Sequence, residues 1–217
     1  MEANFSGKIL ERSPYVPFYF MGHFNSPNDM EGLTRLCFQA STRRPSPNYL
    51  EIGSYTGLSA TVDARYFTKV YCVDKWDGAT TPGEVSGNGN HYQAFVKNMA
   101  GLVPDIVVPL VGTSEFWAQN WHNRDENHVD ATIDMLFIDG MHDYKSVYDD
   151  IINWMGSVRV GGTIAGHDFC PQFPEVEKAV RDIFPGEVNL IGDSIWWVIK
   201  KRPVESIKSR PLNSVEK

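Results

Sequence analysis

Short apolar runs and longer segments with helical spacing alternate along most of the chain. Short runs typical of strands are followed by segments in which apolar residues recur every three or four positions. The strand-like runs are NYLEIG (48–53), KVYCVD (69–74), DIVVPLVG (105–112), IDMLFIDG (133–140) and GGTIAGHDF (161–169). The helical segments are Gly57–Tyr66, 91–102, Ser114–Asn120, 145–158 and 174–184. This alternation predicts a parallel sheet that is covered by helices on both faces.

The last apolar segment, EVNLIGDSIWWVIKK (187–201), has a different pattern. Two strand-like runs are separated by Gly192 and Asp193, which is the signature of a tight turn. We therefore expect an antiparallel hairpin to complete the sheet. In parallel sheets of this kind, ligands bind at the carboxyl ends of the strands.

The N-terminal part lies outside this alternation. Residues 1–27 are rich in Pro, Gly and aromatic residues and predict an irregular arm, followed by a helix from Met30 to Ala40 that Asn28 or Asp29 caps. The predicted division is an arm and helix covering the active site (1–46), a core domain (47–200) and a flexible tail (201–217). The basic segment that starts at Lys200 is polar and interrupted by Pro, which is typical of a solvated tail.

Composition narrows the class of protein. The formal net charge of -7 disfavours a nucleic-acid partner, which requires clustered Lys and Arg. The three cysteines form no short pair, which indicates a reducing compartment. The first residues contain no apolar signal region, and no run approaches the roughly 20 apolar residues of a membrane span. These features predict a cytoplasmic protein that has no membrane partner.

The segment EIGSYTG (51–57) directly follows the first strand of the core. A dinucleotide site requires a second glycine where this chain has Tyr55, and the carboxylate of Glu51 would repel a pyrophosphate. A ligand with a cationic ammonium and sulfonium would instead be attracted by this carboxylate, and Gly53 and Gly57 leave room for it. The alternative is a structural turn between strand and helix.

The next two strands end in residues that suit an adenosine ligand. Asp74 ends the second strand, and a carboxylate at this spacing accepts both hydroxyls of a ribose. Trp76 either covers a ring of the ligand or is a buried structural residue. After the third strand, Thr113 and Ser114 are small enough to let a flat base approach.

Acidic and imidazole groups end the fourth and fifth strands. Asp139 follows the fourth strand, and His167 and Asp168 follow the fifth. Neighbouring strand ends lie about 5 Å apart, so these three side chains can converge on a divalent cation. Oxygen ligands favour Mg²⁺ or Ca²⁺, whereas the imidazole also admits Mn²⁺, Fe²⁺ or Zn²⁺. The alternative is that both aspartates cap helices and that His167 is a buried structural residue.

With these motifs, residues 47–200 resemble the class I S-adenosylmethionine-dependent methyltransferases. The resemblance implies a Rossmann-like, doubly wound α/β fold with a mostly parallel seven-stranded sheet. It also implies that the cofactor is held by residues at four strand ends, with Gly53 and its neighbours under its methionine part and Ser114 or its neighbours beside its adenine. The implied cofactor-binding residues are Glu51, Gly53, Ser54, Tyr55, Gly57, Asp74, Trp76, Thr113, Ser114 and Asp139.

The segments IDGMHDY (138–144) and VGGTIAGHDF (160–169) resemble one subgroup more specifically. This subgroup comprises the metal-dependent O-methyltransferases of natural-product sugars, of the macrocin and mycinamicin type, with the cephalosporin hydroxylase-like proteins nearby. The resemblance implies that Asp139, His167 and Asp168 bind Mg²⁺ and that His142 is the general base. The chain differs from several of these enzymes in having His167 at a position where they have an acidic residue.

The predicted function is a divalent-metal-assisted O-methyltransferase that acts on a small hydroxylated acceptor, with Asp139 and His142 as catalytic residues. Two alternatives remain open: a hydroxylase-like enzyme that holds iron with the same three ligands, and a non-catalytic binding module on the same fold. Residues 78–92 are interpreted as a lid over the acceptor, with a plain flexible loop as the alternative. The aromatic residues of the arm, Tyr15–Phe24, suit a sugar or aromatic acceptor and equally suit a homo-oligomer contact.

Overall fold

The computed structural model describes residues 26–77, 91–121 and 132–202. They form a seven-stranded sheet in the order β3-β2-β1-β4-β5-β7-β6. The pairs among β1 to β5 are parallel, and β7 is antiparallel to both β5 and β6. The predicted doubly wound α/β fold with a C-terminal antiparallel hairpin is therefore confirmed. The strands are β1 (Asn48–Ile52), β2 (Lys69–Asp74), β3 (Val107–Val111), β4 (Ile133–Ile138), β5 (Val158–Gly166), β6 (Asn189–Ile191) and β7 (Ile195–Ile199).

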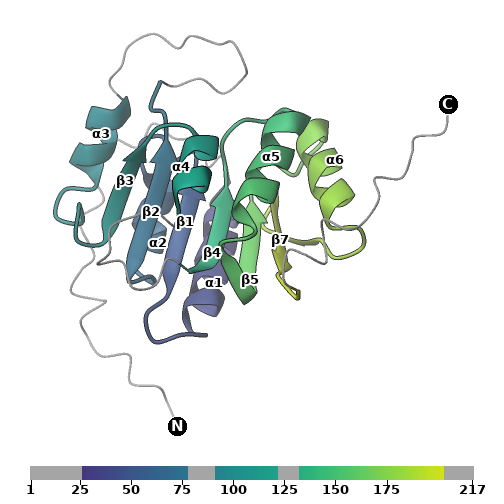
Figure 1. The fold of residues 1–217 in the computed structure, drawn as a ribbon, viewed down its shortest axis with the longest axis horizontal. Coiled ribbons are helices and arrows are strands. Elements are labelled where there is room, and N and C mark those ends of the chain that lie inside the picture. The colour runs from purple at the N-terminus through teal and green to yellow at the C-terminus, as the bar shows by residue number, and fades with distance from the viewer. Residues whose placement is uncertain (1–25, 78–90, 122–131, 203–217) are drawn as a thin grey trace.

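Helices cover both faces of the sheet. Figure 1 shows α4, α5 and α6 in front of the sheet and α1 and α2 behind it. The helices are α1 (Pro27–Ser41), α2 (Leu58–Asp63), α3 (His91–Asn98), α4 (Ser114–Asn120), α5 (Tyr144–Trp154) and α6 (Pro174–Ile183). None of the helices in the described part of the chain combines the length and apolar character that crossing a membrane requires.

The two faces of the sheet form two hydrophobic cores because successive side chains of a strand point to opposite sides. On β1, Leu50 and Ile52 pack with α5 and α6, and Tyr49 packs with α1 and the residues near α2. All five residues of β1 are buried, as expected for a central strand that is covered on both faces.

The strand order reverses next to β1, where β4 lies beside β1 on the side opposite β2. Chain connections therefore leave β1 and β4 toward different sides, which opens a crevice at the carboxyl ends of these two strands. The residues singled out in the sequence lie at the carboxyl ends of β1 to β5 or shortly after them, so the topology brings them to this edge of the sheet.

Two local expectations were wrong. Helix α1 is capped by Ser26, whose side chain accepts a hydrogen bond from the Asn28 N–H, because Pro27 can begin a helix without an amide proton. Asn28 and Asp29 therefore lie inside the first turn. Lys200 does not belong to a solvated tail, since it is only 7% exposed and Nζ donates to the Met155 carbonyl at 2.6 Å.

Several expectations lie outside the described residues. They are the aromatic arm Tyr15–Phe24, residues 78–90 of the expected lid and the tail from residue 203 onward.

Candidate functional site

The turn after β1 requires glycine at two positions. Gly53 has φ +87°, and a Cβ there would lie 2.1 Å from the carbonyl oxygen of Asp139. Gly57 has φ +89°, and a Cβ there would lie 2.7 Å from Met99 Cε. Both are positions of left-handed backbone that favour glycine. The first glycine lets the β1 turn cross the chain after β4 at close range, and the second lets α2 pack close to α3.

Glu51 and Ser54 flank the first of these glycines and are buried. Glu51 is 0% exposed, Ser54 is 2% exposed, and neither Glu51 oxygen nor Ser54 Oγ has a hydrogen-bond partner among the described residues. Burial raises the pKa of Glu51 to about 8. Unpartnered polar atoms at a strand end suit a site that a polar ligand completes.

Asp74 holds the backbone of two neighbouring turns. Its Oδ2 accepts the Tyr55 N–H at 2.7 Å, and its Oδ1 accepts the Trp76 N–H. Tyr55 and Trp76 have φ of +44° and +53°, which are strained values for residues other than glycine. Burial raises the pKa of Asp74, although the two backbone N–H groups oppose the shift. The carboxylate thus joins the ends of β1 and β2, and it is the group predicted to accept the ribose hydroxyls.

Trp76 is 4% exposed, and its indole N–H donates to the Tyr55 carbonyl at 2.6 Å. Its ring lies 4.9 Å from that of Phe95 and 5.0 Å from that of Tyr92. This environment matches the structural alternative that the sequence left open for Trp76.

Thr113 and Ser114 begin α4. Thr113 is the N-cap, and its hydroxyl accepts the Phe116 N–H at 3.2 Å. Ser114 Oγ accepts the indole N–H of Trp154 at 2.8 Å. The Ser114 side chain therefore fixes α4 against α5.

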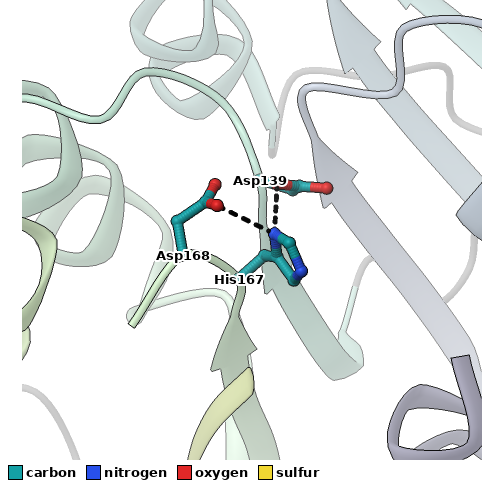
Figure 2. Close-up of side chains that lie close together, drawn as sticks. All are labelled: Asp139, His167 and Asp168. Carbon is teal, nitrogen blue, oxygen red and sulfur yellow. Dashed lines mark ion pairs between the residues drawn. The ribbon is translucent and has the colours of Figure 1, made fainter. Parts of the chain in front are cut away.

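Asp139, His167 and Asp168 converge at the carboxyl ends of β4 and β5. Figure 2 shows both carboxylates approaching the same nitrogen of the His167 ring, with Nδ1 3.5 Å from Asp139 Oδ1 and 3.1 Å from Asp168 Oδ1. One ligand atom from each residue lies within 4.8 Å of the other two. Asp168 has φ +61°, a backbone conformation that Asp tolerates better than most residues. The structure therefore brings together all three predicted metal ligands.

The proximity of these groups shifts their pKa values in opposite directions. Burial raises the pKa of Asp139 to about 6, against the attraction of His167. Burial lowers the pKa of His167, but the hydrogen bond with Asp168 and the charges of Asp139 and Asp29 outweigh it and raise the pKa to about 9. Burial alone would raise the pKa of Asp168, but the hydrogen bonds of His142 and His167 hold it well below its usual range. The cluster therefore holds a proton at His167 when no cation is bound.

His142 lies on the open side of this cluster. Its Nε2 is 3.0 Å from Asp168 Oδ2, and its ring lies 4.3 Å from that of Phe173. The hydrogen bond to Asp168 raises the pKa of His142 above its ordinary value, although burial opposes it. A small pocket beside the two histidines is lined by Ile138, Asp139, Gly140, Met141, His142, Val147, His167, Asp168, Val176 and Trp196.

Sequence reasoning missed two residues of this region, Asp29 and Ser194. Both contact the far side of His167, where Ser194 Oγ lies 3.0 Å and Asp29 Oδ2 lies 3.4 Å from Nε2. Asp29 is 138 positions from His167 along the chain. From the sequence alone it is a candidate cap of the first helix. No spacing or motif in the sequence connects it to the cluster.

A family model described as a methyltransferase domain matches residues 50–169. This segment is more than half of the 217 residues, so the chain belongs to that family, and the predicted class of methyltransferase is confirmed. None of the curated proteins compared with the chain matches it.

Solved structures with the same fold include several O-methyltransferases. An O-methyltransferase from Bacillus cereus in complex with SAH is 18% identical, with a TM-score of 0.59 over 88% of this chain and 89% of that one. The O-methyltransferase NovP is 18% identical, with a TM-score of 0.56 over 81% and 80% of the two chains. A putative caffeoyl-CoA O-methyltransferase from Staphylococcus aureus is 17% identical, with a TM-score of 0.54 over 77% and 82%. At these identities the likeness establishes the fold.

Proposed function

We propose that this methyltransferase transfers a methyl group from S-adenosylmethionine to a hydroxyl of a small acceptor, assisted by a divalent cation. The observation that carries the proposal is the convergence of Asp139, His167 and Asp168 beside the turn of Gly53. One edge of the sheet thus joins a candidate cation site to a candidate cofactor site. A family match and neighbours of the same fold that include an O-methyltransferase in complex with SAH support the choice of cofactor.

The residues at the end of β1 fit the methionine part of this cofactor. Glu51 and Ser54 carry polar atoms that have no partner among the described residues, and Gly53 brings the backbone close without a side chain. A cationic ammonium would favour the ionised form of Glu51, because opposite charge lowers the pKa of a buried carboxyl. A pyrophosphate would meet that same carboxyl and the Tyr55 side chain, so a dinucleotide fits less well.

The geometry of the three ligands fits a small divalent cation. At the roughly 2.1 Å bond length of Mg²⁺, adjacent ligand atoms of an octahedron lie about 3 Å apart. The distances from His167 Nδ1 to the two aspartates, 3.1 and 3.5 Å, are near that value. The donor set of two carboxylates and one imidazole suits Mg²⁺ or Mn²⁺, and a cation would replace the proton that the cluster otherwise holds.

In the proposed mechanism the cation, when bound, supplies Lewis-acid chemistry that lowers the pKa of an acceptor hydroxyl. His142 Nε2 donates to Asp168 Oδ2, so Nδ1 is the nitrogen that remains to accept the hydroxyl proton. The Phe173 ring, which lies 4.3 Å from the His142 ring, restricts its rotation. A positioned base of this kind is typically worth about 10²–10⁴-fold in rate.

The acceptor is proposed to be a sugar-like or natural-product hydroxyl compound. The likeness of IDGMHDY (138–144) and VGGTIAGHDF (160–169) to the sugar O-methyltransferases supports this choice. The assignment to the macrocin and mycinamicin subgroup is part of the same proposal.

The test is calorimetric titration with S-adenosylhomocysteine, with and without Mg²⁺, using NAD as a negative control. We expect micromolar binding of S-adenosylhomocysteine under both conditions and no binding of NAD. Methyl transfer to a panel of sugar and phenolic acceptors is then measured with Mg²⁺ and with a chelator. An Asp139→Asn variant should lose this transfer, and Asp149→Asn, an equal charge change at the side chain that pairs with Lys145, should keep it.

A different experimental result would contradict each part of the proposal. Absence of S-adenosylhomocysteine binding under both conditions would contradict the cofactor. Full transfer in the presence of chelator would remove the cation from the mechanism and leave the cofactor assignment intact. Iron in the purified protein together with dioxygen uptake would instead favour a hydroxylase-like enzyme.

A further inference from the structure

His167 is held from behind by a buried hydrogen-bonded pair. Asp29 is 2% exposed, and its Oδ2 lies 3.0 Å from Ser194 Oγ and 3.4 Å from His167 Nε2. Ser194 Oγ also lies 3.0 Å from His167 Nε2. A carboxylate can only accept, and a hydroxyl has one proton to donate. Ser194 therefore donates to Asp29 and accepts the proton of His167 Nε2.

The backbone fixes the carboxylate of Asp29 in this place. Its other oxygen, Oδ1, accepts the N–H groups of Asp193 and Ser194 at 2.7 and 3.0 Å. Gly192, in the same turn, has φ +68°, and a Cβ there would lie 2.4 Å from Asp29 Oδ1. The turn between β6 and β7 thus wraps closely around Asp29, so this helix residue cannot shift without moving the hairpin.

We propose that Asp29, acting through Ser194, is a positioning residue that holds the proton on His167 Nε2 and presents Nδ1 as the ligand atom. This inference rests on the proposed cation site. The two ring nitrogens are distinct, and the hydrogen bond of one decides which one is free to ligate. A histidine ligand commonly donates its other N–H to a carboxylate or another acceptor, which fixes the ring and increases its basicity.

The two oxygens of Asp29 have separable roles. Oδ1 binds the hairpin turn, and Oδ2 faces Ser194 and His167. In an Asp29→Asn variant the amide oxygen can retain the two backbone N–H groups, while the NH₂ group replaces Oδ2. That NH₂ donates where the carboxylate accepted, so the hydrogen bonds toward His167 reverse. The reversal favours the tautomer in which Nδ1 carries the proton, and such an Nδ1 cannot bind a cation.

The experiment titrates Mn²⁺ into the wild type, Asp29→Asn and Asp193→Asn, with free Mn²⁺ measured by electron paramagnetic resonance. Asp193→Asn is the matched control because it makes the same charge change in the turn that wraps around Asp29, at an exposed residue whose side chain contacts Ser26 and Asn28 rather than His167. We expect Asp29→Asn to weaken Mn²⁺ binding about 10–100-fold and the control to change it less than about twofold. Electron spin-echo modulation from a directly bound ¹⁴N should be present in the wild type and reduced in Asp29→Asn.

The binding of S-adenosylhomocysteine separates this inference from the proposed function. Asp29→Asn should bind it with wild-type affinity, which also shows that the variant is folded. If Asp29→Asn does not fold, Ser194→Ala should also weaken Mn²⁺ binding, since it removes the hydroxyl link and keeps both backbone N–H groups.

Wild-type Mn²⁺ affinity and ¹⁴N modulation in the folded variant would overturn the positioning role. A wild type that binds S-adenosylhomocysteine but no Mn²⁺ would overturn both the cation site and this role, and would leave the cofactor assignment standing.

Discussion

Gly53 and Asp139 touch through their backbones at the point where β1 and β4 end. A Cβ at position 53 would lie 2.1 Å from the Asp139 carbonyl oxygen and 2.7 Å from Gly140 Cα. The Asp139 N–H in turn donates to the Ile52 carbonyl at 2.8 Å. The turn proposed to hold the cofactor and the residue proposed to hold the cation therefore share one rigid junction.

Replacing Gly53 with Ala should disrupt both halves of this junction. The new Cβ meets backbone atoms that cannot rotate away, and the left-handed φ adds about 1–2 kcal/mol of strain. We expect S-adenosylhomocysteine binding to fall below detection and the free energy of unfolding to fall by more than this strain alone. The control is Gly101→Ala, which has φ +85° but no atom within 4 Å of the new Cβ. Equal effects of the two variants in calorimetry and urea unfolding would contradict the shared junction.

Replacing Asp74 with Ala should weaken cofactor binding for two reasons. The variant loses the proposed ribose acceptor, and it releases the Tyr55 and Trp76 N–H groups that hold the neighbouring turns. A hydrogen bond to a charged group is worth about 1.5–3 kcal/mol, which corresponds to about 10–150-fold in affinity. Calorimetry with S-adenosylhomocysteine measures this loss. Asp77→Asn, at an exposed carboxylate that pairs with Lys75, should bind normally, and unimpaired binding by Asp74→Ala would refute the ribose assignment.

The order of strands and helices followed from the sequence because it depends on local patterns. Periodicity identifies strands and helices, and parallel topology then places Asp139, His167 and Asp168 at one edge. The boundaries of two elements differ from the expected ones. Helix α1 begins after Ser26, before the expected caps, because Pro27 supplies the first helical residue. Strand β5 begins at Val158, three residues before the predicted run 161–169, because a register irregularity accommodates Gly161 and Gly162 within the strand.

Contacts between distant segments did not follow from the sequence. Asp29 approaches His167 only because α1 packs against the hairpin of β6 and β7, 164 positions away along the chain. Ser114 is tied to Trp154 across α4 and α5, and Trp76 is buried between Tyr92 and Phe95. In each case tertiary packing decides which way a side chain points, and residue type and spacing leave that choice open.

Lys200 should contribute to stability although it makes no ion pair with a carboxylate among the described residues. Its Nζ donates to the carbonyls of Met155 and Val158, at the end of α5 and the start of β5. In Lys200→Met these buried carbonyls lose their donor, which we expect to cost about 1–3 kcal/mol of unfolding free energy. Urea unfolding measures the loss. The control, Lys201→Met, removes an exposed lysine that pairs with Glu187 and should change stability by less than about 1 kcal/mol. Similar losses in both variants would show that the Lys200 contacts are not stabilising.

The pH dependence of stability should reflect the buried carboxyl of Glu51. Burial raises its pKa in the folded protein to about 8, from an ordinary value of 4.5. Between these two values the folded state keeps the proton and the unfolded state has lost it. Stability falls with rising pH wherever the folded state binds more protons, so Glu51 makes the protein less stable from about pH 5 to pH 8. Below pH 4.5 the carboxyl is protonated in both states and has no such effect.

Replacing Glu51 with Gln should therefore reduce the decline of stability across this window. The amide has nearly the same shape and does not ionise, so the variant should gain stability relative to the wild type as the pH rises from 5 to 8. The measurement is the free energy of unfolding in urea at pH 5, 6, 7 and 8 for both proteins. Glu187→Gln, at an exposed carboxyl, serves as the control and should follow the wild-type curve. If the curves of Glu51→Gln and the wild type ran parallel over this range, the raised pKa of Glu51 would be refuted.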